Sequence, residues 1–210
     1  MVILFREWRY VKLAGINLVK GQKIDLTKGN AGLSNVIVGL GWDPAEPARG
    51  FFGVKKQANV DCDASALMLN ENGKLVKKGN LVCFHNKQSP CNSVIHSGDN
   101  LTGDGDGDDE QIMVNLNAIP SDVHKVLVVV NIYDATNRKQ DFGLIKSAYI
   151  RVMNAVGNNE LIRFNLSDNY NGYTALICGE LYRQGGEWKF AAIGEGSHAA
   201  HINQLAERYV

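Results

Sequence analysis

The most chemically distinctive stretch of the chain is GDNLTGDGDGDDEQI, at residues 98–112. Six of the twelve residues from Asp99 to Glu110 are acidic, none is basic, and glycine stands at 103, 105 and 107. Strand-like segments flank this loop, so folding draws its carboxylates together, and a bound cation or raised pKa values must offset their repulsion. The glycines allow sharp turns that direct backbone carbonyls inward. Clustered oxygen ligands of this kind are typical of calcium, which takes about six to eight of them.

Four further kinds of structure or ion fit the acidic loop less well. A solvated charge run usually lacks glycine spacing, zinc prefers nitrogen and sulfur ligands that the loop lacks, and magnesium usually keeps waters and phosphate partners. An EF-hand needs oxygen-bearing side chains where Leu101 and Gly103 stand, and glycine where Asp104 stands. A calcium-binding β-helix is also disfavoured, because it needs tandem repeats and the chain holds one copy. A calcium loop of a different type is therefore the favoured interpretation.

Four aspartates elsewhere could complete such a site. Asp61 and Asp63 stand two apart in a strand-like segment, so their side chains point to the same side and could face the acidic loop. Asp43 and Asp134 each follow an apolar strand-like run, where strands often deliver ligands at a loop end; a turn or capping role is the alternative for each. The loop acids together with Asp61 and Asp63 carry more charge than one ion neutralises, so we expect two calcium ions.

Short strand-like segments separated by Gly, Asn and Asp turns must position these residues. Asn- and Gly-rich turns at 70–74 and 184–186 indicate hairpins, and helical periodicity is clear only within 197–210. Residues 44–57 form the largest irregular stretch and are interpreted as an exposed insertion. The pattern predicts an all-β fold, a β-sandwich of two packed antiparallel-rich sheets with a short C-terminal helix. The predicted strands cover residues 22–28, 33–42, 60–69, 81–85, 93–97, 111–116, 125–134, 148–154, 161–166, 174–183 and 187–194.

The composition limits the kinds of partner that the chain can have. Its 210 residues include 22 basic and 22 acidic ones, and this zero net charge argues against a general electrostatic grip on nucleic acid or an anionic membrane. No apolar run approaches the ~18 residues that a membrane-spanning helix needs, so we expect no membrane insertion. The four cysteines form no C-x-x-C pair, which favours free thiols in a reducing compartment and a cytoplasmic location.

Signs of catalysis are weak. Cys83 and His85 would point the same way in a strand, but a nucleophilic pair needs a third group to orient it, and none is evident. His198 and His201 stand about one helical turn apart, and two metal ligands without a third are usually ordinary surface residues. No phosphate-cradling loop is recognisable. We therefore predict a protein that is not an enzyme.

Seven motifs in the same order resemble the TerD-type tellurium-resistance and stress-response family. They cover nearly all of the chain from Ile16 to Gly194, and their number and order make the resemblance specific. The resemblance implies a β-sandwich with bound calcium, in a bacterial cytoplasmic protein linked to resistance against tellurite, phage and colicins; some relatives were described as cyclic-AMP-binding proteins. The motifs are INLVKGQKIDLTK, VIVGLGWD, DCDASALML, GDNLTGDGDGDDE, NIYDA, FGLIKSAYIRV and GELYRQGGEWKF.

The resemblance also implies a set of calcium ligands. The family's calcium loop matches five residues here closely, and the acidic residues at 104 and 106 fall where the family varies. The D-x-D-A-S-A match assigns the 61 and 63 carboxylates to the same site, whereas 43 and 134 merely fall within family motifs. The complete predicted ligand set is Asp61, Asp63, Asp99, Asn100, Leu101, Asp104, Asp106, Asp108, Asp109, Glu110, Asp43 and Asp134.

The resulting hypothesis is a single TerD-like domain at residues 15–210, preceded by an extension, 1–14, that is foreign to the domain or results from a misassigned start site. Calcium would order the acidic loop, which would present a surface to other proteins of the resistance system, including a membrane-bound component. A metal-dependent sensor of a nucleotide-like small ligand is one alternative. A hydrolase in which a carboxylate-held metal activates water is another.

Overall fold

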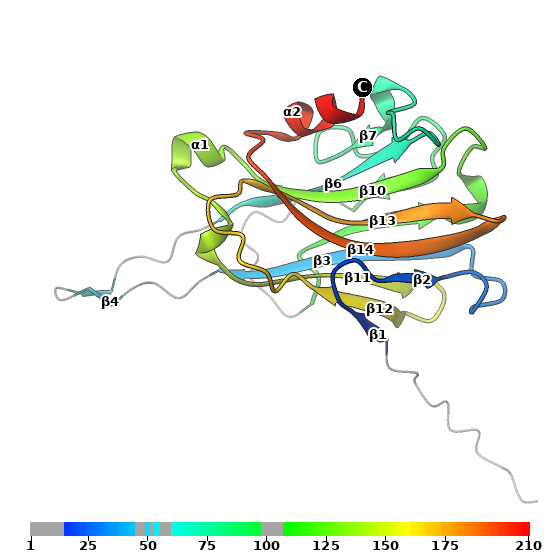
Figure 1. Ribbon diagram of the computed structural model, residues 1–210, viewed down its shortest axis with the longest axis horizontal. Coiled ribbons are helices and arrows are strands. Elements are labelled where there is room, and N and C mark those ends of the chain that lie inside the picture. Colours follow the sequence, from blue (N-terminus) through cyan, green and yellow to red (C-terminus); the bar gives the residue numbers. More distant parts are fainter. Residues whose placement is uncertain (1–14, 45–48, 51–52, 55–59, 98–106) are drawn as a thin grey trace, which may run out of the picture.

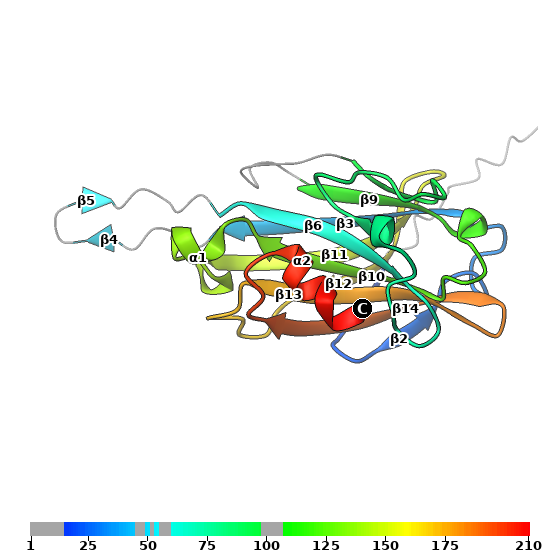
Figure 2. The same ribbon diagram turned by 90° about the horizontal axis from the view of Figure 1, so that it is seen from above.

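Two six-stranded sheets packed face to face form most of the structure, a computed structural model that describes residues 15–44, 49–50, 53–54, 60–97 and 107–210 (Figures 1 and 2). The first sheet has the order β1 (Ile16–Leu18), β12 (Asn159–Asn165), β11 (Ile145–Asn154), β3 (Asn35–Pro44), β9 (Glu110–Asn115), β8 (Val94–His96). The second has the order β2 (Lys23–Asp25), β14 (Glu187–Ser197), β13 (Ala175–Gln184), β10 (Lys125–Ile132), β6 (Cys62–Leu69), β7 (Leu81–Val82).

The predicted β-sandwich is confirmed, and its sheets are antiparallel apart from the pairing of β1 with β12. The Gln-Gly-Gly signal does join β13 to β14, where Gly185 and Gly186 have φ values of +62° and +82°. Both residues therefore occupy the left-handed region that a two-residue hairpin turn demands. β1 is a strand that the sequence pattern did not predict; its three residues are too few to show alternation.

Two predictions of local structure need correction. The stretch 44–57 is not wholly irregular, since β4 (Arg49–Gly50) pairs with β5 (Gly53–Val54). The C-terminal helix is shorter than its periodicity suggested: β14 runs on to Ser197, and α2 covers only Ile202–Ala206 before a 3-10 turn at Glu207–Tyr209. The ring of His201 caps α2 by accepting a hydrogen bond from the Gln204 N–H, which fixes where the helix begins.

Short helices complete the chain. A four-residue helix, α1 (Ala135–Arg138), follows β10 and was not predicted, because one helical turn is too short to show a period of 3.6 residues. The remaining helical turns are 3-10 turns at Lys78–Asn80, Leu116–Ala118 and Phe142–Leu144. Among the residues that the structure describes, no helix has the length and apolar character needed to cross a bilayer.

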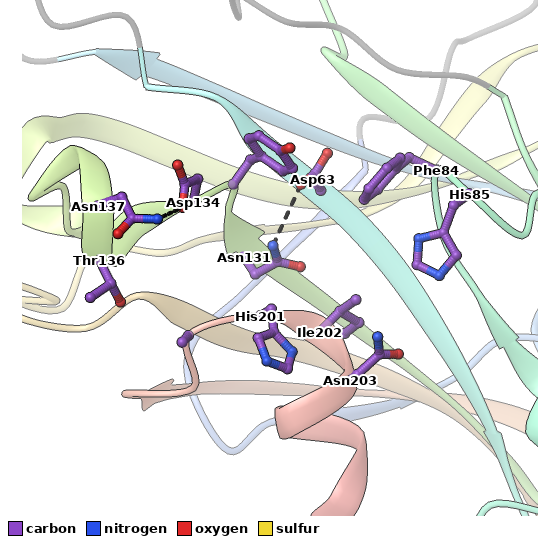
Figure 3. A pocket seen from close by; sticks show the side chains of 12 residues that line it. Asp63, Phe84, His85, Asn131, Asp134, Thr136, Asn137, His201, Ile202 and Asn203 are labelled. Atoms are coloured by element: carbon purple, nitrogen blue, oxygen red, sulfur yellow. Dashed lines mark hydrogen bonds between the residues drawn. The ribbon is translucent and has the colours of Figure 1, made fainter.

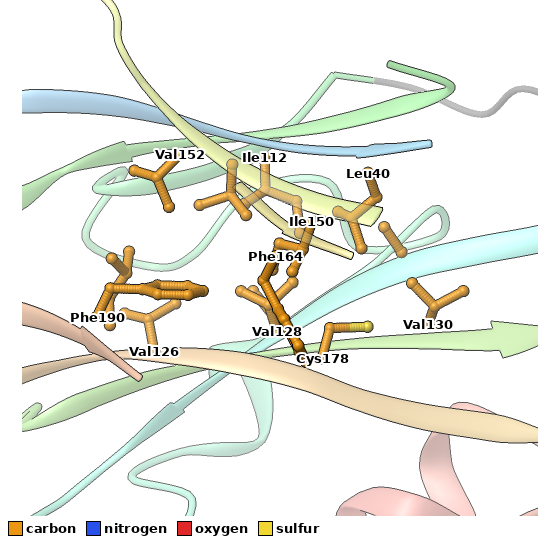
Figure 4. Close-up of a cluster of buried hydrophobic side chains, with 14 of the residues drawn as sticks. Leu40, Ile112, Val126, Val128, Val130, Ile150, Val152, Phe164, Cys178 and Phe190 are labelled. Atoms are coloured by element: carbon orange, nitrogen blue, oxygen red, sulfur yellow. The ribbon is translucent and has the colours of Figure 1, made fainter. Parts of the chain in front are cut away.

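The core lies between the sheets, and a second apolar layer covers the outer face of the second sheet. Between the sheets, Val126 and Val128 of β10 pack with side chains of β3, β9, β11 and β12 (Figure 4). On the other face of the same strand, Leu127 and Val129 pack with residues of α2. Burial on both faces explains why β10 has a continuous apolar sequence, because no side of the strand meets water.

Candidate functional site

The outer face of the first sheet has a depression formed by Gly39 and Gly41 of β3. A Cβ atom at Gly39 would overlap the carboxylate of Asp108, and one at Gly41 would overlap the ring of Tyr149. In the register, Gly39 lies opposite Arg151 of β11 and Gly41 lies opposite Tyr149. The glycines therefore make room for side chains that cross over β3 from the neighbouring strand and from the acidic segment.

Asp108 is held by three donors in this depression. Its Oδ1 accepts hydrogen bonds from Arg151 Nε (2.7 Å) and the Tyr149 hydroxyl (3.0 Å), and its Oδ2 accepts one from Gln111 Nε2 (3.0 Å). Arg151 also contacts Glu160 (3.2 Å). Burial, followed by the charge of Asp108, raises the pKa of Tyr149 to about 12, so this phenol stays protonated and remains a donor. We call these five side chains the Asp108 network.

Asp109 lies beside the network and is placed by the backbone of β3. Its amide donates to the Leu40 carbonyl (2.8 Å), and its Oδ2 accepts from the Trp42 amide (2.7 Å). Burial raises the pKa of Asp109; the bond from Trp42 opposes this shift, and the charges of Asp43, Asp108 and Glu110 add to it. Asp43 itself is exposed and accepts a hydrogen bond from Ser147 (2.5 Å). The neighbouring carboxylates thus make a negative charge on Asp109 costly.

Glu110, the first residue of β9, points into the space between the sheets and is 1% exposed. Its Oε2 accepts a short hydrogen bond from the amide of Ala64 in β6 and lies 3.4 Å from His96 Nε2. Its Oε1 is buried and has no hydrogen-bond partner among the described residues. Such an acceptor normally finds a donor or a cation, because leaving it unsatisfied costs free energy.

Asp61 and Asp63 lie on the opposite side of β6 from Glu110. Alternation along β6 turns Cys62 and Ala64 into the core and Asp63 to the outer face of the second sheet. Arg138 Nη1 of α1 donates to Asp61 Oδ2 (3.2 Å). The shared side of Asp61 and Asp63 follows from their spacing, and the pocket on the outer face of the sheet is what Asp63 lines (Figure 3).

Asp134 follows β10 in a left-handed conformation, with φ at +51°, and its Oδ1 accepts a hydrogen bond from Asn137 Nδ2 (2.7 Å). Aspartate tolerates this conformation better than most residues. Asp134 lines the same pocket as Asp63. It therefore sits beside the second sheet, with Asp63, and not in the Asp108 network.

Cys62 lies between the two acidic groups. Its thiol is fully buried; burial raises its pKa well above the ordinary value, and the carboxylates of Asp63, Asp61, Glu110 and Asp109 each raise it further. One buried thiol therefore senses both groups, which shows that the ends of β6 and β9 gather acidic side chains around a single point. The thiol itself stays protonated at neutral pH.

Part of the predicted ligand set lies in the described structure and part does not. Among the described residues, no three His, Cys, Asp or Glu side chains are grouped closely enough to hold a metal ion by themselves. The ligand set and the number of ions stay predictions. The predicted ligands Asp99, Asn100, Leu101, Asp104 and Asp106, together with the predicted extension 1–14, lie outside the described residues.

Several residues that shape this region were not predicted from the sequence. Arg151 and Tyr149 alternate within a segment that was identified only as a strand, and Asn131 interrupts an apolar run. The Gly-Leu-Gly of β3 was the one available signal, since two glycines on the same face of a strand indicate close approach by another group. The partner that approaches could not be named without the strand order.

The oxygen-rich donors of the site match the preference of a hard cation. Carboxylates dominate both acidic groups, and Glu110 contributes a buried oxygen that is unsatisfied among the described residues. Calcium binds such oxygens without requiring nitrogen or sulfur ligands. The residues present therefore fit a calcium ion better than zinc, because Cys62 is held protonated.

Comparison with known proteins identifies extensive similarity. The family described as TerD domain matches residues 14–209. Stress response protein SCP2 of Bacillus subtilis (strain 168) is 54% identical over 198 residues, covering 93% of this chain and 99% of the relative. Tellurium resistance protein TerD of Serratia marcescens is 43% identical over 194 residues, covering 92% and 96%. The crystal structure of a telluride resistance protein (TerD) homologue from Streptomyces coelicolor A3(2) has a TM-score of 0.60 at 25% identity, covering 80% and 92%.

Proposed function

The chain belongs to the TerD domain family of tellurium-resistance and stress-response proteins, and we propose that it acts there as a non-enzymatic calcium-binding protein. In this proposal, calcium neutralises the acidic segment that ends at Glu110 and orders it. The ordered segment then presents an interaction surface to other proteins of the resistance system, in the cytoplasm, with a membrane-bound component among them.

The observation that carries the proposal is the contrast between charge and compensation at Asp109 and Glu110. Glu110 Oε1 is buried without a hydrogen-bond partner among the described residues, and its Oε2 is 3.4 Å from the nearest imidazole nitrogen. Asp109, the residue before it, has a raised pKa because burial and three neighbouring carboxylates oppose its ionisation. A divalent cation would relieve both conditions at once.

The chemistry of the surrounding side chains supports a non-catalytic role. The thiols of Cys62, Cys83 and Cys178 are buried, and burial raises the pKa of each one, so they are held in their unreactive protonated form. Tyr149 is likewise held protonated and donates to Asp108. These groups serve packing and hydrogen bonding in the structure.

The proposal is tested by a calorimetric calcium titration of the chelator-stripped protein, with thermal melts in calcium, magnesium and EDTA. We expect binding at micromolar or lower concentration and a calcium-specific rise in melting temperature. Binding to the folded state alone stabilises it by about 4 kcal/mol at a thousandfold excess over Kd. The stoichiometry reports whether one or two ions bind.

A matched pair of variants makes the test specific. Glu110→Gln keeps an acceptor for the Ala64 amide but removes the charge, and we expect it to lower calcium affinity by about tenfold or more. Asp122→Asn removes an exposed carboxylate from a distant turn and should bind calcium as the unmodified protein does. Equal calcium affinity in Glu110→Gln and Asp122→Asn, or no heat in any of the three proteins, would contradict the proposal.

A further inference from the structure

A pocket of about 580 Å³ opens on the outer face of the second sheet (Figure 3). Its floor is formed by Asp63 of β6 and Asn131 of β10. Residues 133–137 after β10 line one side, the first turn of α2 lines another, and Phe84 with His85 close a third. This volume lies within the range of sites that bind small molecules.

The floor of the pocket holds a polar atom that the described structure leaves unsatisfied. Asn131 and Asp63 are direct cross-strand neighbours and are each 4% exposed. Asn131 Nδ2 donates to Asp63 Oδ2 at 3.5 Å, and because an ionised carboxylate can only accept, the amide must turn its nitrogen toward Asp63. Asn131 Oδ1 is left buried, without a hydrogen-bond partner among the described residues. A ligand that donates a hydrogen bond would satisfy it.

The charge of the lining indicates what kind of donor fits. Asp63 and Asp134 contribute two carboxylates, and the described lining residues include no lysine or arginine. His201 uses its Nδ1 to accept from the Gln204 amide, which places the proton of the neutral ring on Nε2. The lining therefore favours a positively charged ligand over an anion.

The walls add an aromatic surface. The rings of Phe84 and Tyr133 are packed edge to face, 6.2 Å apart between centroids. Tyr133 is 45% exposed, although most large apolar side chains of the described structure are buried. Aromatic rings attract organic cations and pack against the carbon chains that carry them. Ile202 adds an aliphatic contact from α2.

We propose that this pocket binds a small organic cation, a primary ammonium or guanidinium group carried on a short apolar or aromatic chain. Asn131 Oδ1 accepts a hydrogen bond from the cationic group, Asp63 supplies the compensating charge, and Phe84 and Tyr133 pack against the chain. The proposal goes beyond calcium binding and does not depend on it, because Asn131, Phe84 and Tyr133 lie outside the predicted calcium ligands.

The first experiment compares three probes of the same shape by calorimetry on the full chain in EDTA. Phenethylammonium carries the cation, phenethyl alcohol is its neutral counterpart, and phenylacetate is an anion. We expect phenethylammonium to bind at one site, about tenfold or more tightly than the alcohol, and phenylacetate not to bind. Equal affinity for the alcohol, or no binding of the ammonium at millimolar concentration, would overturn the proposal.

Variants assign the binding to this pocket. Asn131→Leu keeps the volume of the amide but removes its acceptor, so we expect a loss of ammonium affinity of about tenfold. Asn117→Leu changes an exposed amide outside the pocket and should leave the affinity unchanged. Should Asn131→Leu fail to fold by circular dichroism, Phe84→Leu takes its place, and we expect a several-fold loss. Unchanged affinity in the folded pocket variant would overturn the assignment.

A calcium arm separates this inference from the proposed function. The ammonium titration is repeated at saturating calcium, and calcium is titrated into Asn131→Leu or its substitute. Ammonium binding that persists in calcium supports an independent pocket. If calcium abolishes ammonium binding and the pocket variant loses calcium affinity, the pocket belongs to the metal site and the inference fails. Calcium binding without any ammonium binding would likewise end the inference while the proposed function stands.

Discussion

Asp108 and Glu110 are separated by one residue, yet the structure surrounds their carboxylates in different ways. The Asp108 side chain is fully buried on the outer face of the first sheet, where an arginine, a phenol and an amide donate to it. Glu110 points into the sandwich, where a backbone amide and an imidazole approach one oxygen and the other is unsatisfied among the described residues. The protein itself compensates the first charge.

This difference indicates two separate tasks for the acidic segment. The Asp108 network attaches the segment to β3 and β11 through bonds that need no cofactor. Asp109 and Glu110 are then carried to a place where their charges accumulate around Cys62. Damage to the network should therefore reduce stability without calcium, and damage at Asp109 or Glu110 should act mainly on calcium binding. The following predictions test that division.

The largest effect is expected from Arg151→Met. The substitution removes the guanidinium from Asp108, whose side chain has no exposed surface, and leaves a buried charge without its cation. We expect the free energy of unfolding in EDTA to fall by about 3 kcal/mol, measured by urea denaturation. Lys20→Met is the control, because its pair with Asp168 is about half exposed and should contribute less than about 1 kcal/mol.

Arg151→Met also tests the division of tasks directly. Calorimetry on the folded variant should give a calcium affinity within a few-fold of the unmodified protein. A loss of stability equal to that of Lys20→Met would mean that the network does not hold the segment. A loss of calcium affinity comparable to that of Glu110→Gln would mean that the two tasks are not separate.

A smaller loss is expected from Gly39→Ala. The added methyl group would overlap the Asp108 carboxylate, so the network has to shift, and overpacking of this kind costs about 1–3 kcal/mol. Gly29→Ala is a matched control, because its nearest neighbour would be 3.9 Å from the new atom and its φ is not positive. Equal unfolding midpoints for the two alanine variants would show that β3 does not need the depression.

The sequence was enough to predict the sandwich but not the Asp108 network. Alternation and turn residues defined most strands, and the run VLVVV correctly indicated a strand, β10, although it is buried on both faces. The network depends on β11 lying beside β3, a pairing between residues more than one hundred positions apart in the chain. Period-two patterns show which side of a strand a residue occupies, but not which strand lies next to it.

The same limit applies to the acidic residues. The shared side of Asp61 and Asp63 could be predicted from their spacing. The sheet topology was needed to see that Glu110 reaches β6 from the core while Asp63 faces the pocket on the other side. Asn131 carried no sequence signal beyond being polar within an apolar run, and its position opposite Asp63 follows only from the register of β10 with β6.

The smallest expected effect has the opposite sign. The pKa of Asp109 is raised in the folded state by burial and by neighbouring carboxylates, so the folded protein prefers the neutral side chain. The contribution of this group to stability is therefore full below the ordinary value of 3.8 and is lost as the pH rises through the raised folded-state pKa. Asp109→Asn keeps an acceptor for the Trp42 amide and removes the charge.

At neutral pH in EDTA, we expect Asp109→Asn to raise the melting temperature by on the order of 1 °C, a small gain because the side chain is partly exposed and solvent screens its charge. In calcium the order should reverse, since the unmodified protein gains binding energy that the variant lacks. Thermal melts of both proteins in EDTA and calcium, at pH 7 and near pH 4, decide the matter. If Asp109→Asn is less stable than the unmodified protein in EDTA at pH 7, the carboxylate is stabilising without calcium, and Asp109 belongs with Asp108 in the structural network.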